Sequence, residues 1–239
     1  MKKKYIFIMF SVAIILVLTT YSKGLAVKDR YYYENTGEIM WEIDTNEKVV
    51  ALTFDDGPHP KYTAEILDIL LKHQAKATFF VVGEQAEKNP ELISRQFNEG
   101  HEIANHTYTH PLKTTLNKLE EELIQTDDLI FSITGSRPKL FRPVEGQYTD
   151  QMIEKVVEKG YQVVMWSWHQ DTEDWKSTGV HRILKTVLKG VKPGNIILFH
   201  DGGGDRSQTV KALDKIVKDL KEQGYGFVTV SELIEMKNE

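Results

Sequence analysis

Short apolar runs that are typical of buried strands alternate with segments of helical apolar spacing through most of this chain. The alternation begins with a strand-like run at 48–54, a helical segment at 62–73 and a second strand-like run at 77–82. Parallel strands joined by helices bring the residues that follow each strand to one carboxyl edge of the sheet. The pattern therefore predicts an α/β fold with about seven parallel strands, either a barrel or an open doubly wound sheet.

The remaining predicted elements continue this alternation to the end of the chain. Further strand-like runs lie at 102–105, 140–142, 161–168, 195–200 and 226–230. Further helical segments lie at 90–99, 116–134, 150–159, 180–191 and 210–223. With 239 residues, 41% of them hydrophobic, the chain can form one substantial core, so a single main domain is expected.

Composition restricts the chemistry that the chain can perform. There is no cysteine, which excludes disulfides, thiolate zinc sites and cysteine nucleophiles, so a metal ion must be bound by His, Asp or Glu. The formal net charge is −5, and residues 1–26 contain four lysines and no acid, which leaves −9 for the rest. A negative balance argues against nucleic acid as a partner. No protein partner is inferred.

The first 26 residues have the pattern of a targeting segment. Three lysines at 2–4 precede the uncharged, mostly apolar stretch YIFIMFSVAIILVLT at 5–19, which suits a secretory signal or a short membrane anchor. The nearest candidate cleavage site ends around Ala26 and is weak, so an uncleaved anchor in the cytoplasmic membrane is favoured slightly over a cleaved signal. Either form predicts an extracytoplasmic protein, and 27–47 reads as an irregular lead-in.

Two adjacent acids, Asp55 and Asp56, directly follow the first strand-like run in the stretch LTFDDGPHP. Gly57 and Pro58 end the strand and redirect the chain, so both carboxylates are expected at the carboxyl edge of the sheet. Taken alone, such a pair is more often a turn with a helix-capping acid.

A second polar cluster, NHTYTH at 105–110, follows another strand-like run. On a helical turn His106 and His110 would share one face, and two imidazole nitrogens with one Asp oxygen suit zinc. Two unrelated histidines on a surface helix explain this spacing about as often. Asp56 can complete the group and leave coordination positions for water and substrate.

Five stretches, TFDDGP, HTYTH, FRPVEG, QDTEDW and LFHD, resemble the five motifs of the polysaccharide deacetylases, carbohydrate esterase family 4, in order and approximate spacing. The resemblance covers 48–234. It implies a distorted (β/α)7-type barrel over 48–236, preceded by an N-terminal signal or anchor helix. It also implies metal-dependent removal of N-acetyl groups from amino-sugar polymers.

Asp56, His106 and His110 would then bind one divalent ion, with zinc expected and cobalt or nickel as alternatives. Such an ion polarises the acetamide carbonyl and lowers the pKa of a bound water. Asp55 would stay off the ion and accept the proton of the water. Two neighbouring acids thus supply one ligand and one base.

Four further roles follow from the resemblance. The backbone N–H of Glu145 would stabilise the oxyanion, and His200 would donate a proton to the departing amine. Asp174 would orient His200, and Arg142 would pair with the base Asp55. Individually, these residues could also be an ordinary ion pair, a strand-end histidine and a cap.

Aromatic and apolar residues near the strand ends should form a substrate groove. Trp175 and Leu198 match positions that line the acetyl pocket in the family, whereas Trp166 is assigned to core packing and Trp168 is left open. The third motif departs from the family pattern Arg-Pro-Pro-aromatic-Gly, because Val144 and Glu145 replace the second proline and the aromatic residue. This departure leaves the substrate preference open. The GGGD stretch at 202–205 reads as a flexible loop beside the site.

Three functions remain in view. The first is an extracytoplasmic deacetylase of peptidoglycan amino sugars, favoured by the export segment and the motif set. The second is the same chemistry on chitin-like oligosaccharide or exopolysaccharide. The third is a catalytically weak saccharide-binding protein of the cell envelope, which the intact set of candidate catalytic residues disfavours.

Overall fold

The computed structural model of the protein describes residues 28–176 and 178–237. The predicted signal or anchor segment, 1–26, lies outside these residues. Within the described ranges, no helix combines the length and the apolar character needed to cross a membrane. The chain divides into two compact units between Thr36 and Gly37. The first contributes helix α2 (Arg30–Thr36), and all other elements below belong to the second.

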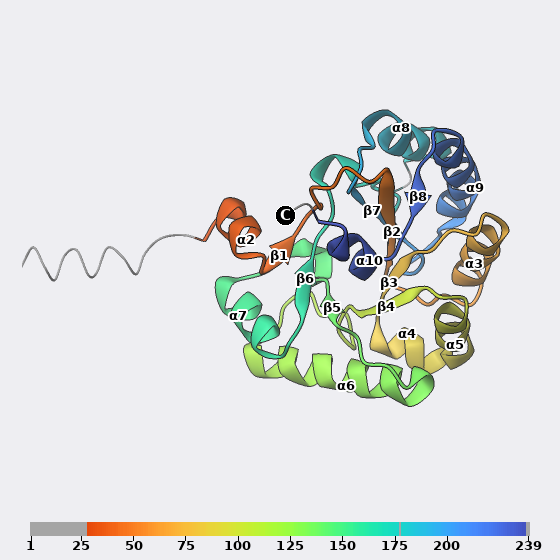
Figure 1. The fold of residues 1–239 in the computed structure, drawn as a ribbon. Coiled ribbons are helices and arrows are strands. Elements are labelled where there is room, and N and C mark those ends of the chain that lie inside the picture. The colour runs from red at the N-terminus through yellow and green to blue at the C-terminus, as the bar shows by residue number, and fades with distance from the viewer. Residues whose placement is uncertain (1–27, 177, 238–239) are drawn as a thin grey trace, which may run out of the picture. The chain divides into compact units, whose positions relative to one another are not determined.

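A parallel sheet forms the centre of the second unit (Figure 1). Its strands among the described residues are β1 (Ile39–Met40), β2 (Val49–Asp55), β3 (Thr78–Val81), β4 (Glu102–Asn105), β5 (Leu140–Phe141), β6 (Gln162–Val164), β7 (Ile196–His200) and β8 (Gly226–Phe227). They follow the order β1-β6-β5-β4-β3-β2-β7, and β8 pairs with β2. Every ladder is parallel. The path ends at β1 and β7, so the sheet is a half-open barrel, which confirms the predicted distorted barrel.

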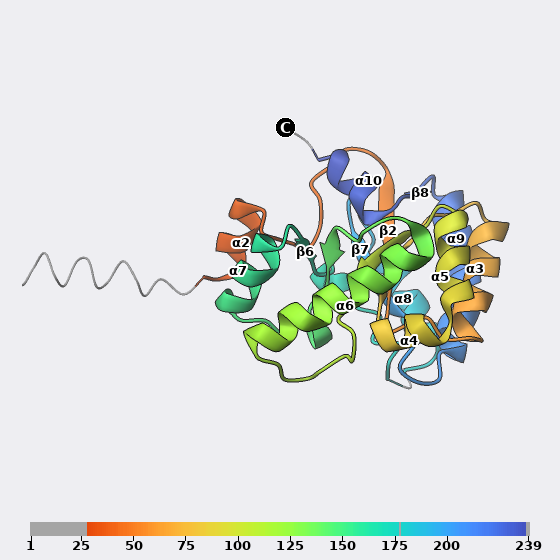
Figure 2. The same ribbon diagram turned by 90° about the horizontal axis from the view of Figure 1, so that it is seen from below.

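Helices surround this sheet, as Figures 1 and 2 show. They are α3 (Tyr62–Lys72), α4 (Gly83–Lys88), α5 (Pro90–Asn98), α6 (Leu116–Thr134), α7 (Asp150–Glu158), α8 (Val180–Gly190), α9 (Ser207–Glu222) and α10 (Val230–Glu235), with short 3-10 turns η1 (Val144–Gly146) and η2 (Trp168–Gln170). Helix α9 packs against α3 and α8, whereas α6 packs against α4, α5 and α7. Helices that alternate with parallel strands in this way form the outer layer of a barrel.

Three stacked phenylalanines align the strands that carry the site. Phe54 on β2 lies in register with Phe79 on β3 and Phe199 on β7. The ring centroids are 5.1 Å apart for Phe54 and Phe79 and 5.5 Å apart for Phe54 and Phe199, and all three side chains are buried. Packing of this kind holds neighbouring strands in one register. The residues that follow, Asp55 and His200, are therefore brought to one edge of the sheet.

Helix α6 matches its predicted bounds because its ends are marked locally. The Thr115 hydroxyl accepts a hydrogen bond from the Lys118 N–H at 3.3 Å, and Gly135 ends the helix with a φ of 73°. A threonine N-cap and a left-handed glycine satisfy backbone groups that the helix leaves unpaired.

Other elements differ from the sequence-based expectation. The lead-in 27–47 contains α2 and β1, and β1 pairs with β6 in the main sheet, so an irregular lead-in is wrong there. The strand expected at 161–168 is only Gln162–Val164, because its neighbours β1 and β5 are two residues long and offer no further pairing. The last strand also ends early, at Phe227, and helix α10 follows.

Candidate active site

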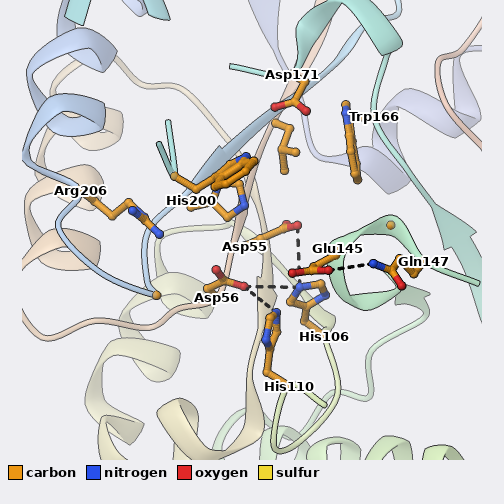
Figure 3. A pocket seen from close by; sticks show the side chains of 14 residues that line it. Asp55, Asp56, His106, His110, Glu145, Gln147, Trp166, Asp171, His200 and Arg206 are labelled. Atoms are coloured by element: carbon orange, nitrogen blue, oxygen red, sulfur yellow. Dashed lines mark hydrogen bonds and ion pairs between the residues drawn. The ribbon is translucent and has the colours of Figure 1, made fainter. Parts of the chain in front are cut away.

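A pocket of about 490 Å³ opens where β2 and β7 end and where the segments after β4 and β5 begin. Figure 3 shows how the labelled side chains converge on it. The pocket is lined by Asp55, Asp56, His106, His110, Glu145, Gly146, Gln147, Trp166, Asp171, Trp175, Leu198, His200, Gly203 and Arg206. Carboxyl ends of parallel strands are the usual position of such sites.

Asp56, His106 and His110 form a group that can bind one metal ion. One potential ligand atom from each lies within 4.8 Å of the other two. Oδ1 of Asp56 lies 3.5 Å from Nε2 of His106 and 3.1 Å from Nε2 of His110 (Figure 3). Two imidazole nitrogens and one carboxylate oxygen suit a divalent transition metal.

A hydrogen bond prepares His106 for this role. Its Nδ1 lies 2.8 Å from the backbone oxygen of Arg142. Because a carbonyl oxygen can only accept, Nδ1 carries the proton, and the lone pair of the neutral ring is on Nε2, which faces Asp56. Metal-binding histidines are commonly oriented through the second ring nitrogen in this way.

His106 and His110 lie on a loop after β4, so the expectation of a helical turn is wrong. Thr107 and His110 have positive φ values of 68° and 56°, and the Thr107 hydroxyl accepts from the His110 N–H at 3.2 Å. The Asn105 side chain accepts from the Thr107 N–H at 2.8 Å. Hydrogen bonds between side chains and the local backbone stabilise turns whose backbone conformation is not helical. The two imidazoles meet because this loop folds back.

Glu122 anchors the same loop, and the sequence pattern did not single it out. This fully buried carboxylate on α6 accepts hydrogen bonds from the Tyr108 N–H at 2.8 Å and from the Thr109 N–H at 2.6 Å. It also accepts from the Thr109 hydroxyl at 2.9 Å. The one available signal was an acid at an inward position of a long amphipathic helix, because buried acids are rare unless they are paired.

The electrostatics of the group keep Asp56 ionised. Burial would raise the pKa of Asp56, but hydrogen bonds from His106 and His110 and the charges of His106 and His200 hold this pKa well below its usual range. For His110, burial lowers the pKa, but the hydrogen bond and charge of Asp56 raise it overall. Metal binding uses this ionised carboxylate, and it displaces the protons that His106 and His110 share with Asp56, because an imidazole binds a metal through an unprotonated nitrogen.

Asp55 lies beside that group and forms an ion pair with Arg142. Nη1 of Arg142 lies 2.7 Å from Oδ1 of Asp55, and both side chains are buried. The guanidinium also donates to the Thr53 hydroxyl at 2.9 Å and to the backbone oxygens of Val164 at 3.1 Å and Met165 at 2.8 Å. Each guanidinium nitrogen is therefore engaged. Asp55 keeps Oδ2 for the pocket, 3.9 Å from Nε2 of His106.

His200, at the end of β7, is held by Asp174. Its Nδ1 lies 2.7 Å from Oδ1 of Asp174, while Oδ2 accepts from the His200 backbone N–H at 3.0 Å and from the Thr209 hydroxyl at 2.6 Å. Burial would lower the pKa of His200, but the hydrogen bond and charge of Asp174 and the charges of Asp55 and Asp56 raise it to about 9. His200 is thus a protonated imidazole that lines the pocket.

The other predicted residues also border this pocket. Glu145 has a left-handed φ of 52°, and its carboxylate accepts from the Gln147 side-chain amide at 2.8 Å. Trp175 and Leu198 line the pocket. Trp166 packs against the core, as expected, and it also lines the pocket.

Two further residues, Asp171 and Arg206, line the pocket and were not among the predicted site residues. Burial raises the pKa of Asp171 above its usual value, although a hydrogen bond from the Glu173 backbone N–H lowers it in part. Arg206 follows the GGGD stretch, and nothing in its spacing to the other motifs marks it as part of the site. Only the folding of that loop against β2 brings Arg206 there.

Comparison with known proteins identifies polysaccharide deacetylases, in agreement with the residues found at the site. The polysaccharide deacetylase family model matches residues 42–164. A peptidoglycan-N-acetylglucosamine deacetylase of Bacillus cereus is 48% identical over 207 residues, which cover 86% of this chain and 97% of that protein.

Solved structures agree in fold. A peptidoglycan N-acetylglucosamine deacetylase in complex with 4-naphthalen-1-yl-N-oxidanyl-benzamide superimposes with a TM-score of 0.83 at 37% identity, covering 88% of this chain and 99% of that one. A family 4 pseudoenzyme from Bacillus anthracis superimposes with a TM-score of 0.76 at 30% identity, covering 84% and 70%. The matched model and the extended identity show that this chain belongs to the polysaccharide deacetylase family.

Proposed function

We propose that this protein is a divalent-metal-dependent hydrolase that removes N-acetyl groups from the amino sugars of peptidoglycan. One observation carries the proposal. A candidate metal group, Asp55 in its ion pair with buried Arg142, and protonated His200 held by Asp174 are brought together at a single pocket, which Asp55 and His200 line. These are the parts that hydrolysis of an amide requires: an electrophile, a base and an acid.

Asp56, His106 and His110 would hold the ion. When bound, a divalent ion polarises the acetamide carbonyl and lowers the pKa of water. We propose zinc, because two imidazoles and a carboxylate are a common ligand set of catalytic zinc, with cobalt or nickel as alternatives. One solved relative is a complex with an N-oxidanyl benzamide, which is a hydroxamic acid. Hydroxamic acids chelate divalent ions, so this complex supports the proposal of a metal ion.

Asp55 is the proposed base. Arg142 occupies Oδ1 at 2.7 Å, which leaves Oδ2 to accept a proton from the attacking water. The new C–O bond converts the acetamide carbonyl carbon to a tetrahedral centre, whose oxyanion the backbone N–H of Glu145 would stabilise. Glu145 borders the pocket, which is compatible with this role.

His200 is the proposed acid. Its Nδ1 proton is held by Asp174, so the proton on Nε2 is the one available to the departing nitrogen. Breaking the C–N bond then releases acetate and leaves a free amine on the sugar. Trp175 and Leu198 would form the wall that receives the acetyl methyl group.

Peptidoglycan is the proposed polymer because the Bacillus cereus relative at 48% identity and the solved relative at 37% identity carry that substrate in their names. We further propose that the protein acts outside the cytoplasm, delivered or anchored by 1–26. Chitin-like oligosaccharide or exopolysaccharide is the second candidate, because Val144 and Glu145 alter the third motif.

A saccharide-binding role without turnover is the third candidate, since the family includes a pseudoenzyme. Against it stands the full set of groups around the pocket. Saccharide binding by Asp55→Asn protein, compared with turnover by the parent, separates the two, because an enzyme would keep binding and lose turnover.

The deciding experiment is acetate release by residues 27–239 from purified peptidoglycan and, in parallel, from N-acetylglucosamine oligomers. Each substrate is tested with added zinc and with a chelator, and Asp55→Asn protein serves as the matched inactive control. Release that requires metal supports the deacetylase and ranks the two polymers. No release from either substrate by folded, metal-loaded protein would contradict the proposed function.

A further inference from the structure

Glu145 adds a carboxylate to the wall of the active-site pocket, although the proposed reaction uses only the backbone N–H of this residue. Glu145 lines the pocket, and Figure 3 shows it across the pocket from Arg206. Its negative charge is one of the contributions that raise the pKa of His110, so the carboxylate acts on the interior of the pocket. Where the third motif of the family has an aromatic residue, this chain therefore has an acid.

A packed turn determines the position of this side chain. Glu145 and Gly146 have left-handed φ values of 52° and 66°, and the Gly146 N–H donates to the backbone oxygen of Pro143 at 3.0 Å. A Cβ atom on Gly146 would lie 2.8 Å from the Trp166 ring, so the turn lies directly against the barrel wall. A left-handed conformation is uncommon for glutamate and costs free energy. The fold thus holds this carboxylate beside the pocket at an energetic cost.

Glu145 has no cationic side chain within ion-pair distance in the parts of the chain that the structure describes. Its Oε2 accepts a hydrogen bond from the neutral side-chain amide of Gln147 at 2.8 Å, which leaves Oε1 for a further donor. By contrast, Asp55 pairs with Arg142, and Asp56 lies between two imidazoles. Charge-assisted hydrogen bonds to a carboxylate are stronger than neutral ones. Glu145 therefore suits a cation that arrives with the ligand.

The proposed reaction itself creates such a cation on the glycan. Hydrolysis replaces a neutral acetamide by a primary amine, which takes up a proton near neutral pH. On the reacting sugar, this ammonium group would lie beside the metal site and protonated His200, whose positive charges repel it. On another sugar of the same strand, it can lie at the pocket wall beside Glu145. A strand that has already lost one acetyl group thus carries the matching charge.

We propose that Glu145 is a specificity-determining residue that binds the protonated amine of a neighbouring, already deacetylated amino sugar in the same strand. This inference rests on the proposed function and deepens it, because it specifies which strands are preferred. Removal of one acetyl group then favours removal of another one nearby. The departure in the third motif gains a role, since an aromatic side chain at this position would offer a wall without charge.

The test varies one chemical group on a short glycan. The probes are tetramers of N-acetylglucosamine in which one defined unit carries an amine or a hydroxyl in place of the acetamide. The hydroxyl is neutral and similar in size to the amine, so the preference between the two reports the charge. Affinities are measured by calorimetry at about pH 6, where the amine is protonated. Full-length, zinc-loaded Asp55→Asn protein is used, so that turnover does not consume the ligand.

For at least one position of the modified unit, we expect the amine to bind about fivefold more tightly than the hydroxyl. Adding Glu145→Gln, which keeps the backbone N–H and the length of the side chain, should reduce this preference to less than about twofold. Raising the salt concentration should also weaken the preference, because the Glu145 side chain is exposed.

Two variants control the comparison. Glu91→Gln removes one negative charge from an exposed position of α5, outside the pocket, and should keep the fivefold preference. Glu145→Asp keeps the charge on a shorter side chain and should keep the preference only in part. Equal binding of amine and hydroxyl at every position by protein that contains Glu145 would overturn the inference. So would a preference that survives Glu145→Gln, because the ammonium group would then bind elsewhere, for instance to Asp171.

Turnover by the parent protein distinguishes an amine on a neighbouring sugar from an amine on the reacting sugar. If the neighbouring sugar presents the amine, kcat/KM should be higher for the amine tetramer than for the hydroxyl tetramer. Inhibition by the amine tetramer without faster turnover would overturn the inference, because the amine would then occupy the place of the acetamide.

The same measurements separate this inference from the proposed function. Acetate release without any preference between amine and hydroxyl overturns the role of Glu145 and leaves the deacetylase standing. An amine preference that requires Glu145, without acetate release from any glycan, supports Glu145 as a cation-binding residue and contradicts the deacetylase. Absence of binding by every tetramer would overturn the inference, which requires the strand to lie over the pocket.

Discussion

Asp174 contacts His200 through both carboxylate oxygens. One oxygen lies 2.7 Å from the imidazole Nδ1, and the other accepts a hydrogen bond from the His200 backbone N–H at 3.0 Å. The carboxylate is fully buried, and the Thr209 hydroxyl donates to it at 2.6 Å. Burial would lower the pKa of His200, but this contact, with smaller contributions from Asp55 and Asp56, raises it to about 9.

The pH profile should depend on this contact. A general acid acts only while protonated, so kcat should hold below the pKa of His200 and fall as the pH rises through it. Asp174→Asn removes the charge that raises this pKa, and the alkaline limb of kcat should move by at least about one unit toward lower pH. Thr209→Val, which keeps the carboxylate, should shift the limb less. An alkaline limb at the same pH in Asp174→Asn protein would contradict His200 as the acid.

Substitution of Asp56 should remove metal binding and turnover, whereas substitution of Asp55 should remove turnover alone. Asp56→Ala or His106→Ala should weaken zinc binding by at least about 100-fold and abolish turnover, because each takes one of three ligands. Asp55→Asn should retain the metal and lose turnover by about 10²- to 10⁴-fold, because it removes the base. Zinc affinity by competition titration and acetate release measure the two effects.

Asp171→Asn is the matched control, since Asp171 lines the same pocket outside the ligand group and its variant should bind zinc as the parent does. Turnover like that of the parent in Asp55→Asn, Asp56→Ala or His106→Ala protein would refute the assigned roles.

The Arg142–Asp55 pair should be important for stability as well as for turnover. Arg142→Gln leaves a buried carboxylate without its cation and removes donors to two backbone carbonyls. Breaking such a pair costs about 3–5 kcal/mol. Urea unfolding in the presence of a chelator measures this loss without the contribution of metal binding. Arg137→Gln breaks an exposed pair with Asp128 and should cost less than about 1 kcal/mol. Equal losses in the two variants would argue against a special role of the buried pair.

Asp201 should make stability fall with rising pH. Burial and the charges of Asp56 and Asp55 raise the pKa of Asp201 to about 7, although the Thr63 hydroxyl donates to it. The folded state therefore keeps the proton that the unfolded state releases near pH 4, so the free energy of unfolding decreases up to about pH 7 and then levels off.

Asp201→Asn should remove this contribution, which is on the order of 2 kcal/mol between pH 5 and pH 8. Urea unfolding of the chelated parent and of Asp201→Asn at both pH values tests the expectation. Parallel pH dependence of the two proteins would show that Asp201 titrates normally in the folded state.

Elements with strong local signals could be predicted from the sequence. Helix α6 and strand β4 have the predicted bounds, because apolar periodicity, a threonine cap and a glycine stop are encoded by neighbouring residues. Strand β6 was predicted too long, because a strand extends only as far as its neighbours pair with it. The apolar character of a segment does not indicate how long its partner strands are when those strands lie far away in the sequence.

For the site, the sequence by itself determined which chemical groups are available and their order along the chain: two adjacent acids, two histidines four residues apart, an arginine after a strand and a histidine at a strand end. Without cysteine, a metal ion could be bound only by His, Asp or Glu side chains. Only the tertiary structure decided that Glu122 anchors the histidine loop and that Trp166 and Arg206 line the pocket. Each of these positions results from packing between different elements, which local periodicity does not indicate.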